Sequence, residues 1–119
     1  MKIDFASRKT TLVATPVDGR LGIFGLASIA QYHLGIDISR GEDFVVFVSK
    51  RRQICKVIFW DGRGACLISR RLHSGRFARY LMDAEGCAAA PITASQLAAY
   101  LDGEPIQVAR TRLLTEDLT

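Results

Sequence analysis

Basic side chains gather in the middle of this 119-residue chain. Residues 50–79 hold nine lysines and arginines against a single acid, Asp61. Residues 1–49 hold five basic and five acidic side chains, and residues 80–119 hold two and six. Lysine and arginine at this density contact phosphate groups, so the segment predicts a polyanionic partner such as nucleic acid. The predicted contact residues are Lys50, Arg51, Arg52, Lys56, Arg63, Arg70, Arg71, Arg76 and Arg79.

Trp60 adds an aromatic ring to this basic segment. If residues 54–60 and 65–72 pair as a hairpin, Lys56 and Arg71 share one face of the sheet with Trp60. Cations beside an exposed ring bind nucleic acid by phosphate contact and base stacking. The same face also carries apolar residues, so a helix that covers it is the competing interpretation.

Motifs with a catalytic spacing are absent: there is no G-x-S-x-G, P-loop, H-E-x-x-H or dinucleotide glycine fingerprint. Asp61 favours an Asx turn or an ion pair over metal or base catalysis. His33 lies near a predicted helix end, and His73 lies in the basic segment, where it could touch phosphate. A nuclease in which Asp18, Asp61 and His73 converge around a divalent ion is the third-ranked hypothesis. The preferred interpretation has no catalytic residues, no metal and no cofactor.

The length and the 49% hydrophobic content fit one domain over residues 1–119, with an ordered core over about 10–108 and loose ends. The three cysteines, Cys55, Cys66 and Cys87, have no C-x-x-C spacing, so they indicate neither a disulfide framework nor a zinc site. No apolar run approaches the roughly 20 residues of a membrane span, and the start lacks the apolar segment of a signal peptide. The sequence predicts a soluble cytoplasmic protein.

The first half of the chain predicts strand, helix and strand. Residues 10–17 are β-branched and apolar enough for a short strand, which a turn after Pro16 ends. Apolar spacings near three and four predict a helix over residues 22–34, with Gly35 as its stop. Residues 44–48 form a short β-rich apolar run, which is typical of a buried strand.

Two further strands, residues 54–60 and 65–72, are predicted to reverse at Asp61-Gly62-Arg63-Gly64, because glycine tolerates positive φ. With Trp60 opposite Ala65, this hairpin and the strand before it make an antiparallel meander. The alternation assigns one face of the hairpin to the core. That face carries Cys55, Val57, Phe59, Cys66 and Ile68.

The last third predicts one helix. Thr93 and Gln96 have the spacing of a capping box, and Gly103 is placed to end the helix. Its apolar face consists of Leu97, Tyr100 and Leu101. The predicted fold class is α+β: a single domain with a mainly antiparallel sheet of four to five strands, a central β-meander and two packed helices.

The segments around this helix are less regular. Residues 78–90 predict irregular structure, with a short strand near residues 87–90 and chain reversals at Gly86 and Pro91. Residues 105–108 predict an edge strand.

A set of short motifs runs in order from residue 12 to residue 103: Val17-Asp18-Gly19-Arg20, Gly22, Gly25-Leu26, Lys50-Arg51-Arg52, Lys56, Trp60-Asp61-Gly62, Gly64, Arg70-Arg71-Leu72, Gly75-Arg76-Phe77, Thr93, Gln96-Leu97 and Leu101. Together they resemble the small accessory protein, often called TnpB, of bacterial transposable elements of the insertion-sequence 66 family. The chain departs from that pattern at Leu21, Phe24, Gln53 and Ile54.

The resemblance implies a mobile-element protein that assists a separate catalytic transposase of the same element in transposition and DNA recombination. The leading hypothesis is a non-enzymatic accessory factor that binds nucleic acid, preferably DNA, through the basic residues and Trp60. The alternative is a protein-interaction module that docks on an acidic surface of the transposase without binding nucleic acid. Structural roles are implied for Asp18, Arg20, Gly22, Asp61, Gly62, Gly64, Gly75 and Phe77.

Overall fold

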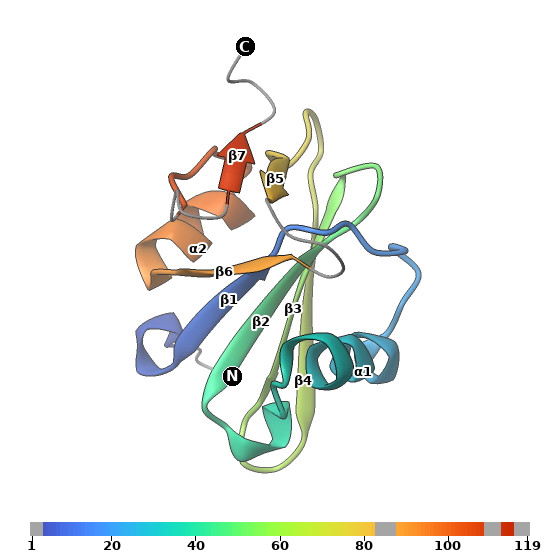
Figure 1. Cartoon of the computed structure of the whole chain (residues 1–119), viewed down its shortest axis with the longest axis vertical. Coiled ribbons are helices and arrows are strands. Elements are labelled where there is room, and N and C mark those ends of the chain that lie inside the picture. Colours follow the sequence, from blue (N-terminus) through green and yellow to red (C-terminus); the bar gives the residue numbers. More distant parts are fainter. Residues whose placement is uncertain (1–3, 83–87, 109–112, 116–119) are drawn as a thin grey trace.

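The computed structural model describes residues 4–82, 88–108 and 113–115. Five strands form one mixed sheet in the order β4-β3-β2-β1-β6 (Figure 1). The strands are β1 Lys9–Val13, β2 Asp43–Val48, β3 Ile54–Trp60, β4 Ala65–Arg71 and β6 Ala89–Ile92. All neighbouring pairs are antiparallel except β1 and β2, which are parallel. The α+β class and the mainly antiparallel sheet of five strands are therefore confirmed.

Helix α1, Ile23–Leu34, connects the two parallel strands and covers one face of the sheet. It ends at Gly35, whose φ of 67° lies in the left-handed region and whose N–H donates to the carbonyls of Ala30 and Gln31. Leu26 and Ala30 pack against β2 and β3, and the short 3-10 helix η2, Ile38–Arg40, closes this core layer. The helix expected over residues 22–34 is thus confirmed within one residue.

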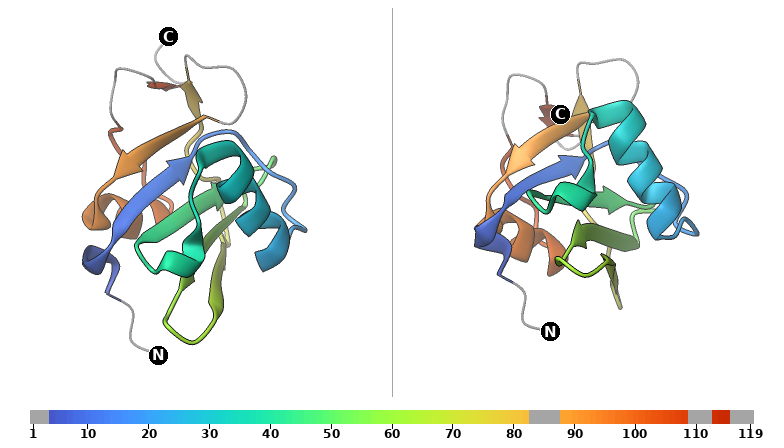
Figure 2. Two further views of the ribbon diagram at one scale, coloured as in Figure 1. Left: turned by 60° about the horizontal axis from the view of Figure 1, so that its bottom comes forward. Right: turned by 90° about the horizontal axis from the view of Figure 1, so that it is seen from below.

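Helix α2, Ala94–Leu101, lies on the opposite face, together with η1, Phe5–Ser7 (Figure 2). Its capping box forms as expected: the Gln96 N–H donates to the Thr93 hydroxyl, and the Gln96 side chain accepts from the Thr93 N–H. This face holds the larger core, in which Tyr100 and Phe77 pack at a centroid distance of 5.3 Å. Neither described helix has the length and hydrophobicity that a transmembrane segment requires.

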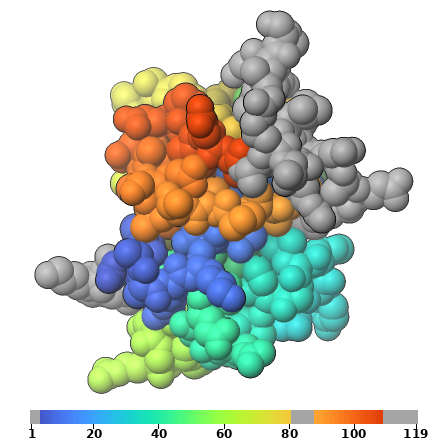
Figure 3. Space-filling view, turned by 60° about the vertical axis from the view of Figure 1, so that its left-hand side comes forward, coloured from blue at the N-terminus to red at the C-terminus, as the bar shows by residue number. Residues whose placement is uncertain are grey.

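Segments distant in sequence lie side by side because β1 is inserted between β2 and β6. In Figure 3 the N-terminal segment lies between the orange segment of β6 and α2 and the green-cyan segment that leads into β2. A separate antiparallel pair consists of β5, Tyr80–Met82, and β7, Leu113–Thr115.

The β3–β4 hairpin has the expected register, with Trp60 opposite Ala65 and Lys56 opposite Ser69. The predicted core face is also confirmed, since its five residues belong to or pack against the α2-side core. At the turn, Asp61 Oδ1 accepts from the N–H groups of Arg63 and Gly64 at 2.8 and 3.0 Å. These bonds make the Asx turn and lower the pKa of the Asp61 carboxyl, because they stabilise its charged form.

Two predictions about β1 and β6 are wrong. The first strand ends at Val13 rather than near Val17, because Pro16 has no N–H to continue the ladder; the Val17 N–H then bonds the Val48 carbonyl. Pro91 is not at a chain reversal but inside β6, an edge strand, where a missing donor is tolerated. Gly86 lies outside the described residues.

The edge strand expected over residues 105–108 does not form. The Tyr80 hydroxyl instead donates to the Ile106 carbonyl and accepts from the Ile106 N–H, both at 2.7 Å. A side chain therefore satisfies the backbone groups that a neighbouring strand would have paired. Burial raises the pKa of the Tyr80 hydroxyl above its ordinary value of 10.

Candidate nucleic-acid interface

Two turns bring most of the basic cluster to one end of the sheet. The β2–β3 turn carries residues 50–52, and the segment after β4 carries Arg76 and Arg79. The Phe77 N–H donates to the Arg52 carbonyl at 2.7 Å, and the Leu72 N–H donates to the Gln53 carbonyl at 3.0 Å. Because Phe77 is also fully buried, the second turn is fixed against the first. We call this region, with Arg20 and Arg71, the basic end.

Arg70 and Arg71 point to opposite faces of the sheet, as neighbours on a strand must. Arg70 lies on the α2 side, where Nη1 donates to the Leu101 carbonyl at 3.4 Å and lies 3.8 Å from the Asp102 carboxylate. A cation at a helix C-terminus is favourable, so Arg70 stabilises the end of α2. Arg71 lies on the α1 side and lines an open pocket of about 500 Å³.

This cationic pocket is walled by four basic residues, Arg20, Lys50, Arg51 and Arg71, together with the carboxylate of Asp18. Four positive charges and one negative charge leave +3 on its walls. Asp18 accepts from the Arg20 N–H and Nε through Oδ1 and from Nη2 through Oδ2, at 2.9, 3.1 and 2.8 Å. The carboxylate therefore orients the Arg20 guanidinium, whose side chain is 91% exposed.

Lys56 attaches the Asp18–Leu21 loop to the sheet. Its Nζ donates to the carbonyls of Gly19 and Leu21, both at 2.7 Å. Gly19 packs so closely on the β2–β3 turn that an added Cβ would lie 3.1 Å from the Ser49 Cβ. Within the Val17-Asp18-Gly19-Arg20 motif, close packing explains the glycine. The ion pair explains the aspartate and the arginine.

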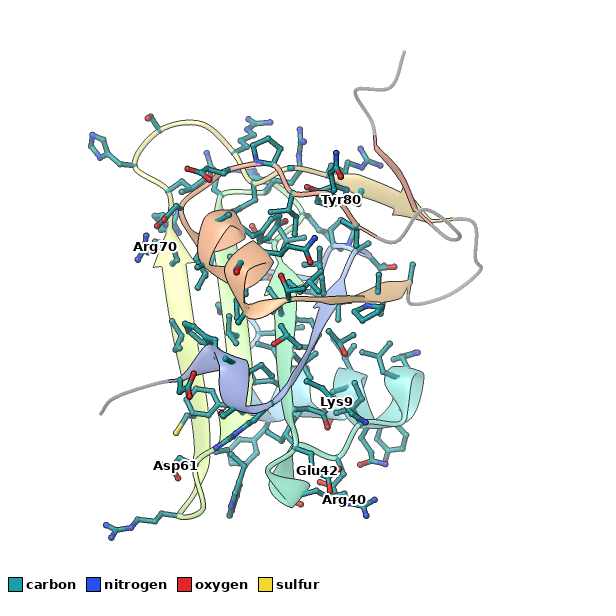
Figure 4. All side chains as sticks on the ribbon, turned by 90° about the vertical axis from the view of Figure 1, so that its left-hand side faces the viewer. Lys9, Arg40, Glu42, Asp61, Arg70 and Tyr80 are labelled. Carbon is teal, nitrogen blue, oxygen red and sulfur yellow. The ribbon has the colours of Figure 1, made fainter. Side chains whose placement is uncertain are left out.

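The other predicted contact residues lie elsewhere. Arg63 is at the tip of the β3–β4 hairpin, far from the basic end; Figure 4 shows the neighbouring Asp61 and Arg70 at opposite ends of that hairpin. Trp60 is half-buried at the Asp61 end, and its carbonyl accepts from Arg8. Ile58, between Trp60 and Lys56, is buried in the α1-side core. The interpretation that a helix covers this part of the face is therefore confirmed for Ile58.

The nuclease hypothesis is wrong in its geometry. Asp18 adjoins the start of β3 and Asp61 follows its end, so about 20 Å of strand separates them. Across the part of the chain that the structure describes, no three His, Cys, Asp or Glu residues are grouped to hold a metal ion.

Comparison with known proteins places the chain in a family. The model of the family described as IS66 Orf2 like protein matches residues 8–111. The chain belongs to this family. The match includes every residue of the cationic pocket and both turns of the basic end.

Two relatives of the IS66 Orf2-like chain come from Sinorhizobium fredii (strain NBRC 101917 / NGR234). "Uncharacterized protein y4jC" is 42% identical over 67 residues, which are 56% of this chain and 56% of that protein. "Uncharacterized protein y4hO" is 40% identical over 86 residues, which are 72% of this chain and 71% of that protein. The first match thus spans little more than half of each protein. No solved structure has a significant match to this chain.

Most of the glycines in the family motifs lie at turns or at a helix start, whereas Gly25 lies inside α1. Gly62 and Gly75 have φ values of 96° and 75°, which side chains rarely adopt. Gly22 is the N-cap of α1, and the Gly64 carbonyl accepts from the Asp61 N–H. Sequence reasoning assigned Arg20 a structural role alone; its exposure on the pocket wall makes it a candidate contact residue, and its spacing from Asp18 was the available signal.

Replacing Lys56 with methionine should destabilise the fold, because two partly buried carbonyls lose a charged donor. We expect the free energy of unfolding in urea to fall by about 1–3 kcal/mol. Arg63→Met, which removes an exposed cation from the hairpin tip, is the matched control and should leave the midpoint unchanged. Equal midpoints for the two variants would contradict the anchoring role of Lys56.

Arg20 should hold the pKa of the Asp18 carboxyl well below its ordinary value of 3.8, chiefly through its side-chain hydrogen bonds. A lowered folded-state pKa contributes stability above pH 3.8, and this stability is lost as the pH falls through the folded value. Carboxyl-detected NMR titration measures the midpoint directly. We expect Arg20→Gln to move it upward toward 3.8, and an unmoved midpoint would exclude the pair.

Proposed function

We propose that this IS66 Orf2-like protein is a non-catalytic accessory factor that assists the transposase of its element by binding DNA through the basic end. The observation that carries the proposal is the cationic pocket, with a net charge of +3 on walls formed by two separate loops, the start of β3 and the end of β4. Arginine forks match phosphate oxygens, and Arg20 is already oriented by Asp18. Membership of a family named for an IS66 reading frame supports the accessory role.

The distribution of charge along the sheet supports the same surface. At the far end, the cations Lys9, Arg40 and Arg63 lie among acids that include Glu42 and Asp61 (Figure 4). That end is nearly balanced, whereas Asp18 is the single carboxylate on the walls of the cationic pocket. Phosphate is attracted to the end where cations outnumber acids, so the molecule has one preferred orientation on a polyanion.

A second function, docking on the transposase without DNA, is favoured by a different observation. Phe24 and Tyr32 on the outer side of α1 are each 85% exposed and line an open groove of about 360 Å³. Exposed aromatic side chains around a groove mark protein contact surfaces. A pull-down with the transposase tests this function. Co-purification should persist after nuclease treatment and should be lost in the variant Phe24→Asp.

Binding to short duplex DNA across a salt series tests the DNA-binding proposal. Neutralising about five phosphates gives a log–log salt slope of roughly −4 to −5. The triple variant Arg20→Ala, Lys50→Ala, Arg71→Ala should flatten the slope by about two to three, because each lost phosphate contact removes about 0.9.

The matched control, Lys9→Ala, Arg40→Ala, Arg63→Ala, removes the same charge from the far end and should leave the slope nearly unchanged. Equal flattening in both triples would mean that net charge, and not the basic end, determines binding. No binding at low salt would contradict the proposal and leave transposase docking.

A further inference from the structure

A second open pocket, of about 360 Å³, adjoins the cationic pocket between α1 and residues 15–18. Its walls are mainly apolar and include Pro16, Leu21 and Ile29, with His33 on the α1 side. The two pockets share Asp18 and Lys50, so one ligand can occupy both. One half of that ligand must be anionic and the other flat or apolar.

A nucleotide of a single DNA strand has both halves. We propose that the cationic pocket binds a phosphate and the apolar pocket binds the unstacked base attached to it. This inference rests on the proposed DNA binding and deepens it, because it names the form of DNA. In a duplex the bases are paired and stacked, so a duplex fills only the cationic pocket. The chain therefore prefers single-stranded or frayed DNA.

The side chains of the apolar pocket suit an aromatic base. Apolar and imidazole surfaces pack against the face of any base, which makes such a pocket tolerant of sequence. Leu21 lies in the loop that Lys56 holds to the sheet, so the same anchor positions both pockets. Leu21 is also one of the positions where the chain departs from the family pattern, and its apolar side chain forms part of the pocket wall.

The test compares three ligands with equal numbers of phosphates: a single strand, the same strand with abasic sites in place of bases, and a duplex. Fluorescence anisotropy at one salt concentration gives the three dissociation constants. We expect the single strand to bind about tenfold tighter than the abasic strand, which is the effect of stacking one base.

Ile29→Trp fills the apolar pocket and should bring this ratio near one without weakening the abasic strand. Gln31→Trp, an exposed position on the other flank of α1, is the matched control and should keep the ratio. His33→Ala changes an exposed position on the pocket wall and should lower the ratio in part. This variant replaces Ile29→Trp as the test if Ile29→Trp is misfolded.

Salt-sensitive binding with a wild-type ratio near one would overturn the base pocket and leave DNA binding intact. No salt-sensitive binding of any of the three ligands would overturn both. A ratio that Ile29→Trp and His33→Ala leave unchanged would place the base elsewhere and also overturn the inference. If an acidic peptide with an apolar side chain binds and none of the DNA ligands displaces it, the two pockets belong to a protein ligand and the inference is overturned.

Discussion

The candidate site depends on one side chain in the middle of a strand. Lys56 projects from β3 toward α1, and its ammonium group binds the carbonyls of Gly19 and Leu21. These two charge-assisted bonds hold the loop that carries Asp18 and Arg20 against the β2–β3 turn. Both pockets have walls from this loop and from Lys50, and Lys56 fixes the loop to β3 beside the backbone bonds that join Val17 to Val48 and Lys50. The sequence pattern predicts Lys56 as a DNA contact, but in the structure its ammonium group supports the loop that forms the site.

Concentrating cations at one end has a physical cost, which the fold limits. Arg70 is directed to the C-terminus of α2, where the helix carbonyls and Asp102 offset its charge. Asp18 offsets Arg20 while keeping its guanidinium exposed. What remains on the pocket walls is repulsive in the free protein, and a bound phosphate would relieve it. The clustered cations therefore lower the stability of the free protein and, in our proposal, provide its affinity for phosphate.

Local patterns predicted the meander and both helices because each had two agreeing signals. The β3–β4 register followed from alternation together with the Asp61 turn, and α1 followed from apolar spacing together with Gly35. The parallel β1–β2 pair and the β5–β7 pair join segments distant in sequence, for which a single sequence has no signal. Strand alternation alone could have predicted that Arg70 and Arg71 point to opposite faces of the sheet. The role of Lys56 could not, because it depends on where another loop lies.

The basic end, and not the hairpin tip or the α2 face, is the surface that we propose contacts DNA. Amide chemical-shift mapping of the labelled protein during titration with a single-stranded oligonucleotide tests it most directly. We expect the largest shifts in residues 18–21, 49–53 and 72–77. Shifts confined to residues 61–64 or to α2 would contradict it.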